Sequence, residues 1–243
     1  MDIRKNTPIN LTLYALATAG TIAGEMYGSH TLVYVCKPMM MVILSSWFFF
    51  NSRRVGDRFT LLIQAGLFFS LIGDVALMFQ HLDDFNFLIG LGAFLIAQLC
   101  YAMGFFQSYN NAGTARGNLI SAVIAVFMVA YGYFFASRLM RLVDETIELP
   151  LGIYTAAITL MGIAAAFRLG RTFLRSFIMV FLGALFFILS DSLLAIDRFF
   201  EPLSYARWAV MLTYAIAQVL IVSGALVHVL DPDEIRRKAA LSA

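Results

Sequence analysis

Residues 177–196 read FIMVFLGALFFILSDSLLAI, a run of apolar side chains with one ionisable member, Asp191. A helix rises about 1.5 Å per residue, so about 20 apolar residues cross the hydrocarbon core of a bilayer. The run lacks the alternation of polar and apolar residues that marks a transmembrane β-strand, and a helix is then the only structure able to span. Residues 177–196 therefore predict a membrane-spanning helix.

The rest of the chain has the same composition. Of its 243 residues, 61% are hydrophobic and 13% are charged. Soluble domains are closer to about half apolar and about a quarter charged. These figures exclude an ordinary globular protein and a disordered chain, and the 2 Cys and 5 Pro exclude disulfide-rich and collagen-like scaffolds. We expect one integral membrane domain over residues 1–243.

Eight apolar runs are bounded by polar or helix-breaking residues, and each predicts a transmembrane helix. They are Ile9–Tyr27, Leu32–Phe50, Phe59–Gln80, Phe85–Ser108, Leu119–Ser137, Leu149–Phe167, Phe177–Ile196 and Ala206–Leu230. Arg4 and Lys5 ahead of the first run imitate a signal peptide, but the run continues to Glu25, which favours a retained helix. The predicted fold class is an all-α polytopic membrane bundle.

The distribution of lysine and arginine predicts its orientation. With the N-terminus inside, the inner segments carry Arg4, Lys5, Arg53, Arg54, Arg58, Arg116, Arg168, Arg171, Arg175, Arg236, Arg237 and Lys238, and the outer loops carry Arg138, Arg141, Arg198 and Arg207. Cytoplasmic loops are enriched in these cations, so both termini are expected in the cytoplasm. The cations form no basic patch with interleaved aromatic residues, so nucleic acid is not an expected partner.

Four ionisable side chains lie inside the spans: Glu25, Lys37, Asp74 and Asp191. Such groups are costly in a bilayer and are often functional. Glu25 near a span end and Lys37 on its long stem can reach the interface, so structural and functional roles both stay open for them. Asp74 and Asp191 are too short to do so, which favours function over a buried ion pair. All four fall in the outer half of the membrane and predict one polar cavity that opens outward.

The third and fourth spans resemble the seventh and eighth. Gly73-Asp74 aligns with Ser190-Asp191, and Phe94-x-x-Ala97-Gln98 aligns with Tyr214-x-x-Ala217-Gln218. An offset of four helices keeps the direction unchanged, so we predict a parallel repeat about an axis along the membrane normal. The repeat would place two carboxylates and two amides at a shared interface.

Several short motifs occur in order along the spans. They are Lys37-Pro38, Gly73-Asp74 with Leu77, Phe94 with Ala97-Gln98 and Tyr101, Gly183–Phe187 leading into Ser190-Asp191, Arg198-Phe199, and Thr213-Tyr214 with Ala217-Gln218. Together they resemble the YhhN-type lysoplasmalogenase family over nearly the whole chain. The resemblance implies hydrolysis of the vinyl ether bond of choline or ethanolamine lysoplasmalogens, which yields a long-chain aldehyde and a glycerophospho-base.

Cleavage of a vinyl ether begins with proton transfer to the carbon β to the oxygen, and water then adds to the resulting cation. A protonated acid and an ionised carboxylate suit this chemistry, which makes Asp74 and Asp191 the catalytic candidates in either order. The candidate substrate-binding residues are Lys37, Glu25, Gln98, Tyr101, Tyr214, Gln218 and Arg198. No metal or other cofactor is expected, because no pair of the three histidines has zinc-ligand spacing.

The expected partners are a lysophospholipid substrate and the lipid bilayer, without an obligate protein partner, in what we expect to be a bacterial inner membrane. A proton-coupled or lipid transporter remains an alternative, with Asp74, Asp191 and Lys37 as its relay. A retinal-type photoreceptor with Lys37 as Schiff base fits poorly, since Lys37 lies early in the second span.

Overall fold

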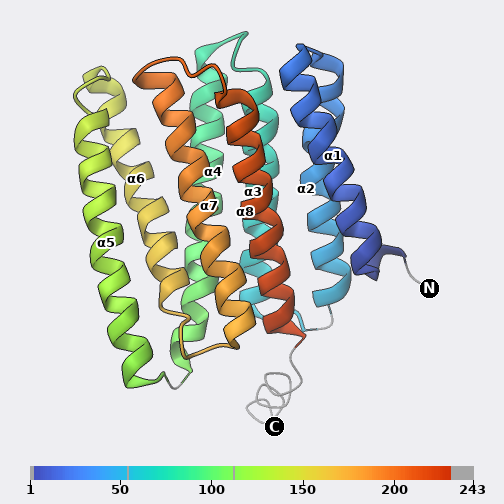
Figure 1. Cartoon of the computed structure of the whole chain (residues 1–243), viewed down its shortest axis with the longest axis vertical. Coiled ribbons are helices and arrows are strands. Elements are labelled where there is room, and N and C mark those ends of the chain that lie inside the picture. Colours follow the sequence, from blue (N-terminus) through green and yellow to red (C-terminus); the bar gives the residue numbers. More distant parts are fainter. Residues whose placement is uncertain (1–2, 54, 112, 231–243) are drawn as a thin grey trace.

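The computed structural model describes residues 3–53, 55–111 and 113–230. In these ranges the chain forms eight α-helices, two short 3-10 helices and no β-strand (Figure 1). The α-helices are α1 (Thr7–Tyr27), α2 (His30–Ser52), α3 (Arg58–Met78), α4 (Asp84–Phe106), α5 (Ala115–Leu139), α6 (Glu145–Ala166), α7 (Leu174–Phe199) and α8 (Ala206–Val229). The 3-10 helices η1 (Ile3–Lys5) and η2 (Gln107–Asn110) precede α1 and follow α4. The all-helical prediction is confirmed.

Polar side chains mark where several of these helices begin. Asp57 accepts a hydrogen bond from the backbone N–H of Thr60 at 2.9 Å, and Thr114 accepts one from Gly117 at 3.0 Å. Such caps satisfy backbone donors that have no partner in the first helical turn. Gly28 ends α1 in the left-handed conformation, with φ +68°, which an L side chain adopts only under strain.

Seven helices in the described part of the chain, α2 to α8, are long and apolar enough to cross a membrane. The protein is therefore a multi-pass integral membrane protein. The remaining predicted span, α1, has 21 residues but includes threonines, Asn10 and Glu25, which lower its hydropathy. The prediction of eight spans is thus not confirmed for α1. Arg54 and the basic tail residues 236–238, used in the charge count, lie outside the described residues.

The bundle has a central group of four helices with a pair on either side. Figure 1 shows α1 and α2 at one edge and α5 and α6 at the other, with α3, α4, α7 and α8 between them. Glycines bring the central helices close, because a Cβ atom at Gly73 would overlap the ring of Phe94 and one at Gly183 would overlap Ile221. Much of α5 is exposed, as expected of a helix that faces lipid.

An aromatic cluster of Phe94, Phe187 and Tyr214 fills the middle of the central group. The ring centre of Tyr214 lies 5.7 Å from that of Phe94 and 5.8 Å from that of Phe187, with both contacts edge to face. This is the favoured geometry for aromatic pairs.

Since successive helices run in opposite directions, α1, α3, α5 and α7 all end on the same side of the bundle (Figure 1). Gly28 follows α1 there, so this side is called the Gly28 end.

Candidate active site

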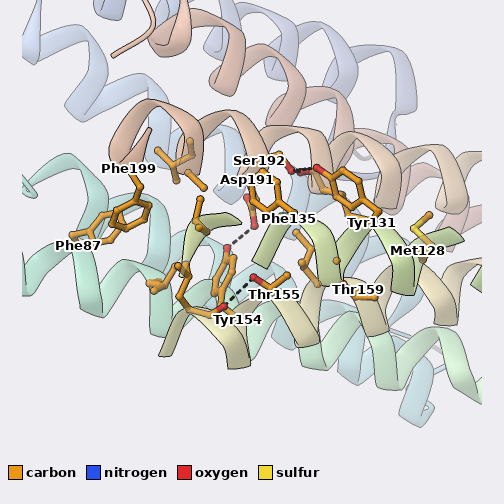
Figure 2. Close-up of a pocket in the computed structure, with 18 residues that line it drawn as sticks. Phe87, Met128, Tyr131, Phe135, Tyr154, Thr155, Thr159, Asp191, Ser192 and Phe199 are labelled. Atoms are coloured by element: carbon orange, nitrogen blue, oxygen red, sulfur yellow. Dashed lines mark hydrogen bonds between the residues drawn. The ribbon is translucent and has the colours of Figure 1, made fainter. Parts of the chain in front are cut away.

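An apolar cavity lies between α4, α5, α6 and α7, with an empty volume of about 640 Å³ including its mouth. In Figure 2 Phe87 and Phe199 lie at one end of it, Met128 at the other, and Asp191 between them. Most of the wall is aliphatic or aromatic. The side chains that bring polar groups to the wall are Tyr131, Tyr154, Thr155, Thr159, Asp191 and Ser192. Such a cavity suits a hydrocarbon chain that carries one group in need of polar contact.

Asp191 is the only acidic side chain in the described wall of the apolar cavity. In the described chain Oδ2 of its carboxyl group accepts two hydrogen bonds. One comes from Gln98 Nε2 at 2.8 Å, and the other comes from the Tyr154 hydroxyl at 2.5 Å, which Figure 2 shows. A carboxyl oxygen of this kind has two lone pairs, and these two donors occupy both. Within the described ranges Oδ1 receives no hydrogen bond, so it is the oxygen left for a molecule in the cavity.

A second polar pair lies beside Asp191. The hydroxyl groups of Tyr131 on α5 and Ser192 on α7 are 2.7 Å apart (Figure 2). Ser192 also donates to the backbone carbonyl of Ile188 at 2.6 Å, so the shared proton of the pair comes from Tyr131. The pair joins the peripheral helix α5 to the central group next to the candidate acid.

Asp74 belongs to a different cluster. The residue is 2% exposed. Its Oδ2 accepts a hydrogen bond from the Tyr214 hydroxyl at 2.8 Å, and its Oδ1 lies 3.9 Å from Lys37 Nζ. The buried ion pair between Asp74 and Lys37, one of the interpretations left open by the sequence, is therefore present.

Tyr101 and Gln218 form a closed chain of hydrogen bonds. The Tyr101 hydroxyl donates to Gln218 Oε1 at 2.8 Å, and Gln218 Nε2 donates to Ser70 Oγ at 3.0 Å. All three side chains are fully buried, and the chain links α4, α8 and α3. This arrangement connects helices, whereas the sequence predicts substrate contact for Tyr101 and Gln218; that contact stays a prediction.

A polar cavity of about 900 Å³, mouth included, opens between α1, α2, α3 and α8 at the Gly28 end. Its polar and aromatic wall residues are Glu25, His30, Tyr34, Lys37, Gln80, His81 and Arg207. Glu25 and Lys37 thus line one space, as the sequence predicts. Arg198 does not line it; this exposed residue at the end of α7 places its guanidinium carbon 5.0 Å from the ring centre of Phe87, at the end of the apolar cavity.

The expectation of one shared polar cavity is wrong. Lys37, the ion-pair partner of Asp74, lines the polar cavity, and Asp191 lines the apolar cavity, which is formed by a different set of four helices. The aromatic cluster explains the separation. Tyr214 contacts Asp74, while Phe94 and Phe187 each lie one helical turn before Gln98 and Asp191, so large rings stand between the two carboxyl groups.

Comparison with known proteins assigns the chain to a family. The model of the YhhN family matches residues 32–225. The chain belongs to the YhhN family. It is 32% identical over 167 residues to lysoplasmalogenase TMEM86A of Homo sapiens; the aligned region covers 68% of this chain and 65% of that protein. TMEM86A of Bos taurus is 30% identical over 198 residues, covering 79% and 76%. The lysoplasmalogenase of Mycobacterium bovis is 31% identical over 143 residues, covering 57% and 50%. No solved structure matches.

The match confirms the resemblance to the YhhN family. It includes every candidate residue except Glu25, which precedes residue 32. The relatives of this YhhN protein carry the names of hydrolases, so the transporter alternative is not favoured. Among the residues that the structure describes, no group of three or more His, Cys, Asp and Glu side chains is placed to hold a metal ion.

The sequence of this YhhN protein does not reveal Tyr154, the second donor to Asp191. A tyrosine inside an apolar span is usually a packing residue, and nothing in the residues around position 154 distinguishes it. Only the packing of α6 against α4 and α7 brings its hydroxyl to the carboxyl group. Tyr131 and Ser192 were missed for the same reason.

Proposed function

We propose that this protein is a lysoplasmalogenase that hydrolyses the vinyl ether bond of choline or ethanolamine lysoplasmalogens to a fatty aldehyde and a glycerophospho-base. Family membership and the names of its relatives support this activity. The observation that carries the proposal is Asp191, a carboxyl group in an apolar cavity with both lone pairs of Oδ2 occupied and Oδ1 open.

The substrate fits the apolar cavity in one direction. Arg198 follows Asp191 by seven residues, about two helical turns and about 10 Å along α7 on the same face. The glycerol backbone separates the vinyl ether from the phosphate by a similar length. We place the phosphate at Arg198, the vinyl ether at Asp191 and the alkyl chain toward Met128.

The first step is proton transfer from Asp191. With Oδ2 accepting two hydrogen bonds as the carbonyl oxygen, the acidic proton resides on Oδ1. The π electrons of the vinyl ether form a new C–H bond with this proton at the carbon β to oxygen. The product is an oxocarbenium cation beside the Asp191 carboxylate, which Gln98 and Tyr154 stabilise by hydrogen bonds.

The second step restores Asp191. A water oxygen bonds to the cationic carbon, and the water proton passes to the carboxylate, which leaves a neutral hemiacetal. The hemiacetal C–O bond to glycerol then breaks; the glycerol oxygen takes the hemiacetal proton, and the aldehyde is released. One carboxyl group thus serves as acid and then as base.

Asp74 is the second carboxylate of the proposal. It is paired with Lys37, and Tyr214, which donates to it, packs on Phe94, one turn before Gln98. Asp74 therefore acts on the Asp191 site through Tyr214 and Phe94, as a positioning residue. Tyr101 and Gln218 support the same helices α4 and α8.

We infer that residues 1–243 form one membrane domain of eight spans with both termini in the cytoplasm of a bacterial cell. The charge bias of the loops supports this orientation. Pairing of α3 with α4 and of α7 with α8 supports a parallel repeat. In this orientation the polar cavity opens toward the outer face, at the Gly28 end.

The test is aldehyde release by the purified protein in detergent from a lysoplasmalogen, an ester lysolipid and an alkyl-ether lysolipid. Only the lysoplasmalogen is expected to release aldehyde. Asp191→Asn is expected to lower the rate by about 1,000-fold, in line with loss of a general acid. Asp74→Asn is expected to cost about tenfold in kcat with KM unchanged.

Asp197→Asn is the matched control. It makes the same change on the same helix, and the new side chain keeps an oxygen that can accept the hydrogen bond of 2.8 Å from the Leu203 N–H. Its activity should equal that of the wild type. Absence of aldehyde from all three lipids, or full activity of Asp191→Asn, would refute the proposal.

A further inference from the structure

The polar cavity plays no part in the proposed cleavage, yet it holds unpartnered charges. It shares no wall residue with the apolar cavity in the described chain, and its wall comes from α1, α2, α3 and α8. The polar cavity opens at the Gly28 end, and Phe87 and Phe199 of the apolar cavity lie on helices α4 and α7 near the same end. A ligand small and polar enough to enter this space would meet Glu25, Lys37 and Arg207.

Lys37 is the buried cation of this cavity. Its side chain is 9% exposed, and its Nζ lies 3.9 Å from Asp74 Oδ1, which is too long for a hydrogen bond. None of its three N–H donors has a hydrogen bond among the residues that the structure describes. Burial of an ammonium group without hydrogen bonds is costly, so a ligand with anionic oxygens would be stabilised here.

Glu25 and Arg207 supply a separated pair of charges. Neither side chain has an ion pair or hydrogen bond within the described ranges, although both line the cavity. Because Asp74 neutralises Lys37, and Glu25 balances Arg207, the charges sum to zero. The ring of Tyr34, held 5.3 Å from that of Phe79, adds an aromatic surface of the kind that binds quaternary ammonium groups.

We propose that the polar cavity binds a zwitterionic phospho-amine, with the phosphate at Lys37 and Arg207 and the ammonium group at Glu25 and Tyr34. A neutral ligand with separated charges matches the neutral wall, whereas a simple anion would face Glu25. The inference rests on the proposed function in one respect, since glycerophosphocholine and glycerophosphoethanolamine are both lysolipid headgroups and free products of that reaction.

Calorimetric titration of the purified protein in a maltoside detergent tests the site. Glycerophosphocholine is expected to bind more tightly than glycerol 3-phosphate or inorganic phosphate. Glu25→Gln should weaken glycerophosphocholine about tenfold and leave glycerol 3-phosphate unweakened, and Arg207→Gln should weaken both about tenfold. Arg141→Gln is the matched control, because this exposed arginine just after the end of α5 lines neither cavity, and it should change neither affinity.

Competition by an ester lysophosphatidylcholine identifies the source of the ligand. Displacement of glycerophosphocholine assigns the cavity to the headgroup of an intact lipid, and its absence assigns the cavity to the free product. Failure of glycerophosphocholine to bind, or equal binding by Glu25→Gln and Arg207→Gln, would overturn the inference. Aldehyde release measured on the same preparation separates the two proposals, because activity without this binding refutes only the polar site.

Discussion

Replacing Tyr154 with phenylalanine removes the hydroxyl that donates to Asp191 Oδ2 and keeps the ring, which is only 7% exposed. In the proposed mechanism Asp191 becomes negatively charged in the transition state, so this hydrogen bond strengthens as the proton leaves. A hydrogen bond to a charged group contributes about 1.5–3 kcal/mol, which corresponds to roughly 10- to 150-fold in rate. The loss should fall on kcat, with KM little changed, because the interaction is made mainly in the transition state.

The assay is the initial rate of aldehyde release over a range of lysoplasmalogen concentrations. Tyr131→Phe is the matched control. It also removes a tyrosine hydroxyl from the apolar cavity, but this hydroxyl pairs with Ser192 and not with Asp191. Its kcat should stay close to that of the wild type. Equal kcat values for Tyr154→Phe and the wild type, or equal losses in both variants, would show that the donor to Oδ2 has no special role.

Four further outcomes are expected. Met128→Trp should shorten the apolar cavity, so that the last two methylenes of a long alkyl chain are no longer buried. Each buried methylene contributes about 0.8 kcal/mol, so KM for long chains should rise about tenfold relative to chains two methylenes shorter. A series of substrates of different chain length measures this. Lys37→Met should destabilise the protein by about 3–5 kcal/mol by leaving Asp74 buried without its cation, and adding Asp74→Asn should recover most of the loss in detergent unfolding experiments. Arg198→Gln should raise KM about tenfold without lowering kcat, because its proposed contact is to the phosphate of the bound substrate. A reporter fused at Ala243 should be cytoplasmic, and an external signal would reverse the orientation.

The sequence by itself determined the helices of this protein. In a bilayer, backbone groups must pair within the segment, so the length of an apolar run largely sets the length of a helix. Residues 177–196, predicted as a span, lie inside α7, Leu174–Phe199. Local residues mark helix ends for equally local reasons: Asp57 through its side chain and Gly28 through its left-handed backbone. Asp74, Asp191 and Lys37 stood out in the sequence because an ionisable group is costly inside a bilayer.

The partners of those residues were decided by the tertiary structure. Gln98 and Asp191 are 93 positions apart in the chain, and Asp74 and Tyr214 are 140 apart. Depth in the membrane follows from position along one helix, but the direction in which a side chain points depends on how that helix is rotated against its neighbours. The sequence therefore placed both carboxylates at a similar depth and predicted one cavity. In the tertiary structure, packing of Phe94, Phe187 and Tyr214 between the central helices separates the two carboxyl groups into two different clusters.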